Sequence, residues 1–350
     1  MKNNQVRAQA LPVLIGLAAG AVSVQGGMDL WGEEPNRLGF AIRPAFNIKA
    51  SFSDLGGAPA QTDVGPAVGG VNHYYDDGYN LVDSSGNGEG TTWYWGYSKN
   101  SQVGEGYVDM SSSYAAPAGS LSEVTNDPHW GGELTYMREI GWNNSYWYGV
   151  VVGLGWHHLR FAQDSNFAYA AQRLTDRYSS QLIAAEDMPP APYAGGFDDV
   201  AGPQLSDTPE RSVTTLPGEA FTRGSYDYEA EAYALRVGLL FETPFSDGFD
   251  LQFGGGVVGT MVDGRFSFRE RTVVSNLSDY EVAGEEKEAA FAGGGYGEIN
   301  LSLRVSKGIY AFVGAQYLIL SDITHSVGGR TVQLDLKNGI LASAGMTFAF

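Results

Sequence analysis

Six charged side chains stand within stretches of sequence that otherwise alternate apolar residues with small or polar ones. A charge buried without a partner is strongly unfavourable, so such residues must pair with opposite charges. Arginines and glutamates in equal number can neutralise one another and fill a narrow interior. The sequence therefore predicts a buried network that blocks free diffusion, with a narrow gated pore as the alternative. Its members are Arg43, Glu133, Arg236, Glu242, Glu298 and Arg304.

The histidines are the other candidates for chemistry. A histidine hydrogen-bonded to a serine and oriented by a carboxylate can activate a nucleophile for hydrolysis or acyl transfer. His157 and His158 are consecutive, so on a strand one of them must point outward. Nothing in the spacing selects their partners, and we therefore favour solvated or interfacial histidines over a lipid-modifying enzyme. The candidates are His73, His129, His157, His158 and His325.

Composition excludes several classes of function. Cysteine is absent, which excludes a disulfide scaffold, a thiolate metal site and a cysteine nucleophile. The net charge of −19 argues against binding nucleic acid. The acidic residues gather in expected loops, but their spacing forms no metal cage, so we predict no metal and no cofactor. The segment Gly254–Gly259 matches G-x-G-x-x-G, but alternation continues through it, which favours a strand over a dinucleotide site.

These side chains require strands to position them. Apolar residues recur with a period of two, which places them on one face of a strand, and the last strand keeps this pattern to the final residue. We predict eight strands, with ten as the alternative if the first long loop adds a hairpin. They are Leu38–Phe52, Trp130–Ile140, Tyr146–Phe161, Tyr226–Thr243, Phe249–Phe268, Glu288–Val305, Ile309–Leu320 and Thr331–Phe350.

Connections of two lengths alternate along the chain. Three are short and rich in turn residues: 141–145, 244–248 and 306–308. Four are longer: 53–129, 162–225, 269–287 and 321–330. Within the longest pair, 106–114 is a candidate extra strand and 166–185 a candidate short helix. Short turns at one end and long loops at the other are typical of an outer-membrane barrel, with the turns in the periplasm.

The apolar faces of these strands need a nonaqueous surrounding. The fold prediction is an all-β, up-and-down antiparallel transmembrane barrel, since a barrel leaves no unpaired edge in lipid. A soluble β-sandwich is the alternative. The residues expected to face lipid are Phe40, Ile42, Val150, Val152, Leu154, Val237, Leu239, Leu301 and Leu303.

The N-terminus predicts export. Lys2 and Arg7 precede an apolar run over 11–24, followed by small residues, which is the layout of a secretory signal peptide. The predicted organisation is a cleaved signal peptide over 1–26, a short periplasmic segment over 27–37, and a single barrel over 38–350. Its long loops are 53–129 and 162–225. A membrane-anchoring or buried first helix is the alternative to the signal peptide.

With these features, the chain resembles small bacterial outer-membrane β-barrels of the OmpA and OmpX type. The resemblance covers the strands, about half of the chain, and rests on architecture rather than on a diagnostic motif. The ending Met346-x-Phe348-x-Phe350 is similar to the C-terminal signal that the barrel-assembly machinery recognises in such proteins. The resemblance implies a bacterial outer-membrane location, with outer-membrane lipid and the assembly machinery as partners.

The predicted function is a non-enzymatic, structural or surface-interaction role in the cell envelope. The long loops are expected to contact an extracellular ligand, while the Arg/Glu network closes the lumen. A porin-like narrow channel is the first alternative, and the lipid-modifying enzyme is the second.

Overall fold

The fold is described from a computed structural model, which describes residues 35–143, 145–180, 184–195, 203–246, 248–275 and 279–350. The predicted signal peptide over 1–26, and residues 27–34 of the segment after it, lie outside the described residues. No helix in the described ranges is long and apolar enough to cross a membrane.

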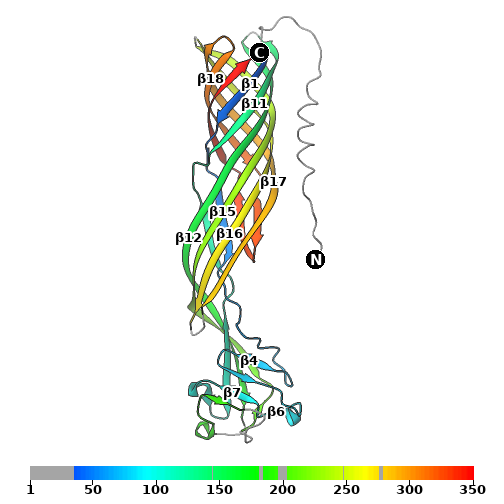
Figure 1. Ribbon diagram of the computed structural model, residues 1–350, viewed down its shortest axis with the longest axis vertical. Helices are drawn as coiled ribbons and strands as arrows, with labels where there is room; N and C mark the ends of the chain where they lie inside the picture. Colours follow the sequence, from blue (N-terminus) through cyan, green and yellow to red (C-terminus); the bar gives the residue numbers. More distant parts are fainter. Residues whose placement is uncertain (1–34, 144, 181–183, 196–202, 247, 276–278) are drawn as a thin grey trace.

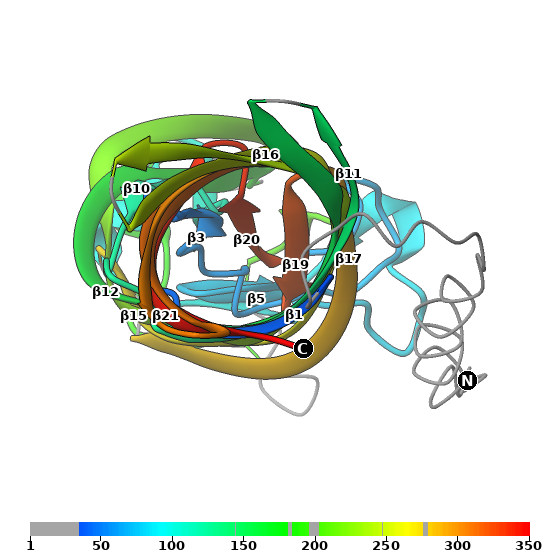
Figure 2. The same cartoon turned by 90° about the horizontal axis from the view of Figure 1, so that it is seen from above.

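Eight antiparallel strands pair in a closed ring (Figures 1 and 2). In ring order they are β1 (Asn36–Ile42), β11 (Gly131–Asn143), β12 (Tyr146–Ser179), β15 (Glu210–Ser246), β16 (Phe249–Val274), β17 (Tyr280–Ser306), β18 (Ile309–Leu320) and β21 (Gly339–Ala349). The ring closes where the first strand pairs with the last, Phe40 lying opposite Met346. The fold class and the choice of eight strands over ten are confirmed.

The two ends of the barrel differ as expected. Only two residues separate Asn143 from Tyr146, Ser246 from Phe249 and Ser306 from Ile309, at the end where the C-terminus lies (Figure 1). At the other end, β12, β15, β16 and β17 continue for a total of 34, 37, 26 and 27 residues. About 9–11 residues suffice to cross a bilayer, so these four strands project far beyond the membrane.

This projection corrects the predicted loops. Residues 162–225 are mostly strand, because β12 and β15 stay paired from Trp147 opposite Glu242 to Arg177 opposite Glu210. The helix considered for 166–185 is wrong, since β12 runs to Ser179. The loop predicted over 269–287 is likewise mostly the ends of β16 and β17. Sequence alternation continues through these segments, but their outward residues are charged and no longer mark a membrane strand.

A second sheet fills the space between the projecting strands. It has four antiparallel strands in the order β10 (Gly119–Val124), β3 (Lys49–Leu55), β20 (Arg330–Asp335) and β19 (Ile323–Val327). Viewed along the barrel axis, β3, β19 and β20 lie inside the ring (Figure 2). We call this the interior sheet. We call the projecting parts of β12, β15, β16 and β17, together with this sheet, the stalk.

Two predicted strands are therefore split between wall and interior. The segment 38–52 is interrupted after Ile42 by Pro44, which has no N–H to donate to a neighbouring strand, but it stays in the wall to Phe46, opposite Ile340 of β21. After the short β2 (Ala45–Phe46), Asn47 has a φ of 58° and turns the chain into β3. The terminal segment 331–350 breaks between Asp335 and Gly339, so β20 belongs to the interior sheet and only β21 to the wall.

The main hydrophobic core lies between the interior sheet and the stalk wall. Phe52 of β3 is 1% exposed and packs against Tyr226 and Phe266, with ring centroids 5.9 and 5.7 Å apart. Val332 and Leu334 of β20 are each 1% exposed in the same core. The stalk is therefore solid, with aromatic and aliphatic side chains filling its interior.

The far end of the molecule forms a small folded module, which we call the head (Figure 1). It contains β4 (His73–Tyr75), β5 (Gly78–Asn80), β6 (Thr91–Thr92), β7 (Trp95–Tyr97), β8 (Val103–Gly104), β9 (Tyr107–Tyr114), β13 (Tyr193–Ala194), β14 (Leu205–Ser206) and the 3-10 turns η1 (Gly88–Gly90), η2 (Asn100–Gln102) and η3 (Ala185–Asp187). β9 confirms the extra strand expected over 106–114, and it pairs with the end of β12.

Candidate functional site

The inner layer of the lumen is an ion-pair network across the ring. Arg236 of β15 lies at its centre, with its guanidinium 2.7 Å from Glu133 of β11 and 2.8 Å from Glu298 of β17. Arg43, which follows β1, reaches the same Glu133 at 2.8 Å. It also donates to Gln316 of β18. These side chains are buried, and they connect strands on all sides of the lumen.

Glycines make room for this layer. The ring of Tyr296 lies 4.9 Å below the Arg236 guanidinium. A Cβ at Gly238 would lie 2.3 Å from the Tyr296 hydroxyl, and one at Gly256 would lie 2.1 Å from the carbonyl oxygen of Val237. Gly256 belongs to the G-x-G-x-x-G match, so those glycines serve strand packing, and the match lies wholly within β16.

A second ion pair lies nearer the short turns. Arg37 donates to Glu242 at 2.9 Å, between the rings of Trp147 at 4.5 Å and Tyr310 at 4.9 Å. Sequence reasoning missed Arg37 by assigning it to the periplasmic segment. It is an even number of residues before Arg43, so the same alternation already placed it inward.

Arg304 is a correction to the predicted network. Its side chain is exposed near the β17–β18 turn and contacts the Tyr310 hydroxyl at 3.3 Å. Position 304 lies so close to the end of β17 that its side chain is not buried, and water can solvate the guanidinium. The other five predicted network residues are buried, but Glu242 pairs with Arg37 in the second ion pair, apart from the other four.

The outer layer of the lumen is the interior sheet, which a buried polar cluster fixes to the wall. Glu270 of β16 is fully buried and accepts hydrogen bonds from Arg330 of β20 at 2.6 Å and Tyr226 of β15 at 2.9 Å. The backbone N–H of Gly56, just after β3, donates to Glu270 at 2.8 Å. Burial raises the pKa of Tyr226, and the Glu270 carboxylate raises it further, so this phenol remains a donor.

Little space remains between the two layers. The cavity there has a volume of about 50 Å³. It is lined by Arg43 and Arg236 on one side and by Ile48, Leu336 and Leu341 on the other. A volume of this size has room for only a few water molecules. Ions or solutes crossing the barrel would therefore have to displace both layers.

The structure separates the candidate histidines. His73 lies in the head, with its ring nitrogens 2.7 and 3.1 Å from the carbonyl oxygens of Val64 and Val68. His158 points outward and lies 2.9 Å from Glu231. Within the described residues no hydrogen bond joins a histidine to a serine. The remaining three lie buried or in the lumen: His129 against Phe161, His157 beside the cavity and His325 against Tyr228.

The outer surface of the barrel carries an apolar band. Seven of the predicted lipid-facing residues are 37% to 60% exposed, and Val150 and Val152 are partly exposed. The seven are Phe40, Ile42, Leu154, Val237, Leu239, Leu301 and Leu303. Phe348 stacks on Phe40 at 6.1 Å, and Phe350 is 60% exposed at the rim. Met346 lies on the same strand, opposite Phe40. A closed ring with this band matches a barrel embedded in lipid.

The band ends at a row of large side chains, beyond which the outward residues become polar. In register across four strands, this row is Trp156, Tyr233, Met261 and Phe291. We call it the boundary row. The next outward row is His158, Glu231, Asp263 and Ala289, followed by Arg160, Glu229, Arg265 and Lys287. Aromatic residues at the limit of an apolar band mark the membrane–water interface.

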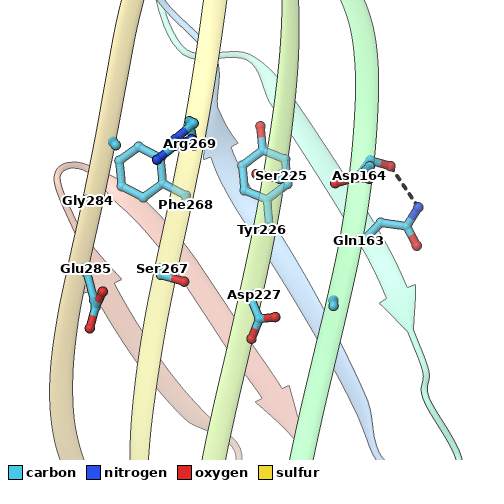
Figure 3. Close-up of a pocket in the computed structure, with 12 residues that line it drawn as sticks. Gln163, Asp164, Ser225, Tyr226, Asp227, Ser267, Phe268, Arg269, Gly284 and Glu285 are labelled. Carbon is cyan, nitrogen blue, oxygen red and sulfur yellow. Dashed lines mark hydrogen bonds between the residues drawn. The ribbon is translucent and has the colours of Figure 1, made fainter.

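A groove of about 580 Å³ crosses the outer face of the stalk (Figure 3). Two successive outward rows line it, and half of their side chains are alanine or serine. These rows are Ala162, Asp227, Ser267 and Glu285, then Asp164, Ser225, Arg269 and Ala283. Longer side chains border the groove, because the rows on either side contain Arg160 and Arg265, or Arg223 and Arg271.

A scan against protein-family models finds no match, and a search of curated proteins finds none either. Solved structures that match the chain include three outer-membrane proteins. Ail of Yersinia pestis, in complex with the heparin analogue sucrose octasulfate, has a TM-score of 0.27 at 10% identity, covering 89% of this chain and 99% of its own. OprG of Pseudomonas aeruginosa has a TM-score of 0.33 at 9% identity, covering 91% and 98%. The outer membrane protease OmpT of Escherichia coli has a TM-score of 0.31 at 9% identity, covering 90% and 97%.

Because these TM-scores are low, the class of the protein is assigned from its own strand pairing and surface. A closed ring of eight antiparallel strands, an apolar outer band and unequal ends define an outer-membrane β-barrel. The buried Arg/Glu network inside it is a feature of this chain's own lumen.

Proposed function

We propose that this chain is a closed, non-enzymatic barrel of the bacterial outer membrane that presents its head to partners outside the cell. The observation that carries the proposal is the double closure of the lumen. The network around Arg236 spans the ring, and the interior sheet fills the stalk beyond it. Since both layers close the lumen among the described residues, we assign the function to the parts outside the membrane.

The construction of the head supports a role in surface interaction. Asp176, at the end of β12, is fully buried and pairs with Arg211 of β15 at 2.7 Å. The hydroxyl of Tyr75 donates to the same carboxylate at 2.6 Å and lies 2.7 Å from the Tyr178 hydroxyl. These contacts join the head to the ends of two stalk strands. A rigid scaffold that positions exposed loops is a common arrangement for binding.

The proposal includes two further steps that the sequence predicted. Export through the signal peptide brings the chain to the periplasm, and the terminal Phe350 directs it to the barrel-assembly machinery. Deleting Phe350 should lower the amount of folded protein in outer-membrane fractions, whereas substituting the exposed Val213 by alanine should not.

Single-channel conductance in a planar bilayer tests the closure. We expect no stable conductance steps from the refolded wild type. The double variant Arg236→Ala/Glu298→Ala should also be silent, because the interior sheet remains in place. Conductance from the double variant alone would assign the closure to the ionic layer. Stable steps from the wild type would contradict the proposal and favour the narrow channel.

The absence of enzymatic activity remains a prediction. The outward pair of His158 and Glu231 lies next to the boundary row and is the best-placed pair for contact with lipid. We expect purified protein to release no fatty acid from phospholipid vesicles. Release that is lost in His158→Asn, and retained in a variant of the buried His325, would favour the lipid-modifying enzyme.

A further inference from the structure

The height of the stalk groove above the membrane limits what can occupy it. Its first row lies six residues beyond the boundary row on each strand, for example Ala162 after Trp156 and Asp227 before Tyr233. At about 3.3 Å per residue and a tilt of about 40°, this is roughly 15 Å above the apolar band. Phospholipid headgroups extend only about 5–8 Å beyond the hydrocarbon core. A lipid that reaches the groove must therefore have a larger headgroup.

The groove also faces sideways. It lies on the outer wall of β12, β15, β16 and β17 (Figure 3). The lipid-facing band lies further along the same strands. Two polar rows, which begin at His158 and at Arg160, separate the groove from the boundary row. A molecule standing beside the protein in the outer leaflet meets the band with its acyl chains and the groove with its headgroup.

The side chains of the groove suit a sugar that carries an acidic group. Asp164 offers acceptors for hydroxyl groups, and so does Glu285, whose carboxylate also lies 3.6 Å from Arg265. Ser225 and Ser267 offer both donors and acceptors. Arg269 is exposed and has no ion pair or hydrogen bond among the described residues. Arginine is the side chain best suited to bind a phosphate with two parallel hydrogen bonds, and this guanidinium is free to do so.

The neighbouring arginines behave differently. Arg160 pairs with Asp227 at 3.0 Å, and Arg265 pairs with Glu229 at 2.8 Å. Arg269 instead lies between Ser225 and Ala283 on the adjacent strands, so the positions beside it hold no carboxylate. The groove is thus lined by short side chains, by hydrogen-bond acceptors, and by one arginine, Arg269, that forms no ion pair among the described residues.

We propose that this groove binds the phosphorylated oligosaccharide headgroup of an outer-leaflet glycolipid. Arg269 binds a phosphate, the carboxylates accept hydrogen bonds from sugar hydroxyls, and the alanines and serines let the sugar rings approach the sheet. This proposal can be tested apart from the closed lumen. Conductance measures whether the lumen is open, and lipid retention measures whether the groove binds glycolipid.

Native mass spectrometry of the delipidated protein in detergent tests this site. Three probes are compared at equal concentration: a glycolipid with a phosphorylated core oligosaccharide, the same glycolipid after enzymatic removal of its phosphates, and phosphatidylglycerol. We expect retention of the first, with about tenfold weaker retention of the other two, the loss typical of a charge-assisted contact. Equal retention of phosphatidylglycerol would overturn the proposal.

Two variants and a matched control locate the binding. Ser225→Trp fills the groove and should lower retention of the phosphorylated glycolipid about tenfold. Thr214→Trp places the same side chain at an exposed position of the same strand outside the groove and should have no effect. Arg269→Ala should lower retention of the phosphorylated probe to that of the dephosphorylated one. Wild-type retention in both groove variants would overturn the proposal.

Discussion

Four strands run through both the barrel and the stalk, yet the polarity of their two faces is reversed between the two regions. In the barrel part of β15 the inward Arg236 is charged and the outward Val237 is apolar. In the stalk part of the same strand the inward Tyr226 and Tyr228 pack in a hydrophobic core, and the outward Asp227 is charged. The side-chain period is continuous along β15, so the reversal reflects only the surroundings. Lipid outside permits a polar interior, and water outside requires an apolar one.

The largest effect should come from removing the central charge of the barrel. Arg236→Ala leaves Glu133 and Glu298 with fewer partners in a buried site, and breaking such a pair costs about 3–5 kcal/mol. We expect a loss of this size in the free energy of unfolding, measured by urea titration in lipid vesicles. The exposed Arg304→Ala is the matched control and should change it by less than about 0.5 kcal/mol. Equal losses from both would mean that the inner layer does not stabilise the barrel.

The next largest effect is the cost in stability of an outward-facing arginine, which should differ between the two sides of the boundary row. Val237 and Val213 lie on β15 and are 45% and 54% exposed, but Val237 lies in the apolar band and Val213 near the head. Val237→Arg should destabilise the barrel by about 2–4 kcal/mol, the cost of an arginine facing the bilayer centre. Val213→Arg should be nearly neutral by the same titration. Similar costs at the two sites would show that the reversal does not mark the membrane boundary.

The reversal also explains which parts of the fold the sequence could predict. The strand Ile309–Leu320 was predicted with the observed bounds. The three short turns were predicted at the right places but too long, at 141–145, 244–248 and 306–308, because the strands beside them extend further. Apolar outward residues and turn chemistry coincide in these regions. Residues 162–225 were taken as a loop because their outward residues are polar and their inward aromatics were not recognised as facing a core. A strand with polar outward residues and apolar inward residues is harder to recognise from sequence when the interior sheet that covers its inward face is not known.

The interior sheet could not be predicted for a different reason. It combines β3, at the end of the first predicted strand, and β10, from the first long loop, with β19, from the last loop, and β20, at the start of the last predicted strand. Such distant pairing leaves no local sequence signal. Glu270 and Arg330 fix this sheet, but the first was placed in a loop and the second at a loop end. The ionic layer was easier to predict, because Arg43, Glu133 and Arg236 interrupt strands whose alternation is otherwise clear.

The smallest expected effect depends on pH and belongs to the stalk. His325 of β19 is 4% exposed and meets the ring of Tyr228 edge-on at 5.4 Å. Burial lowers its pKa, although the carboxylates of Glu288 and Asp263 act in the opposite direction. The unfolded chain binds a proton near pH 6.5, whereas the folded stalk does so only at lower pH. Stability should therefore fall as the pH drops below about 6.5, by at most about 1.4 kcal/mol per unit, until the folded pKa is passed.

Urea unfolding of the stalk at pH 7.5 and pH 5, followed by protease cleavage, measures this loss. His325→Phe keeps an aromatic ring at this position but removes the titrating group. The stability of this variant should therefore depend less on pH than that of the wild type. His158→Phe is the control, because that ring is exposed on the outer face. If His325→Phe and the wild type lose the same stability between the two pH values, other groups account for the acid sensitivity, among them the buried His129, whose pKa burial also lowers. The core around Tyr228 would then contribute nothing to the pH dependence of the stalk.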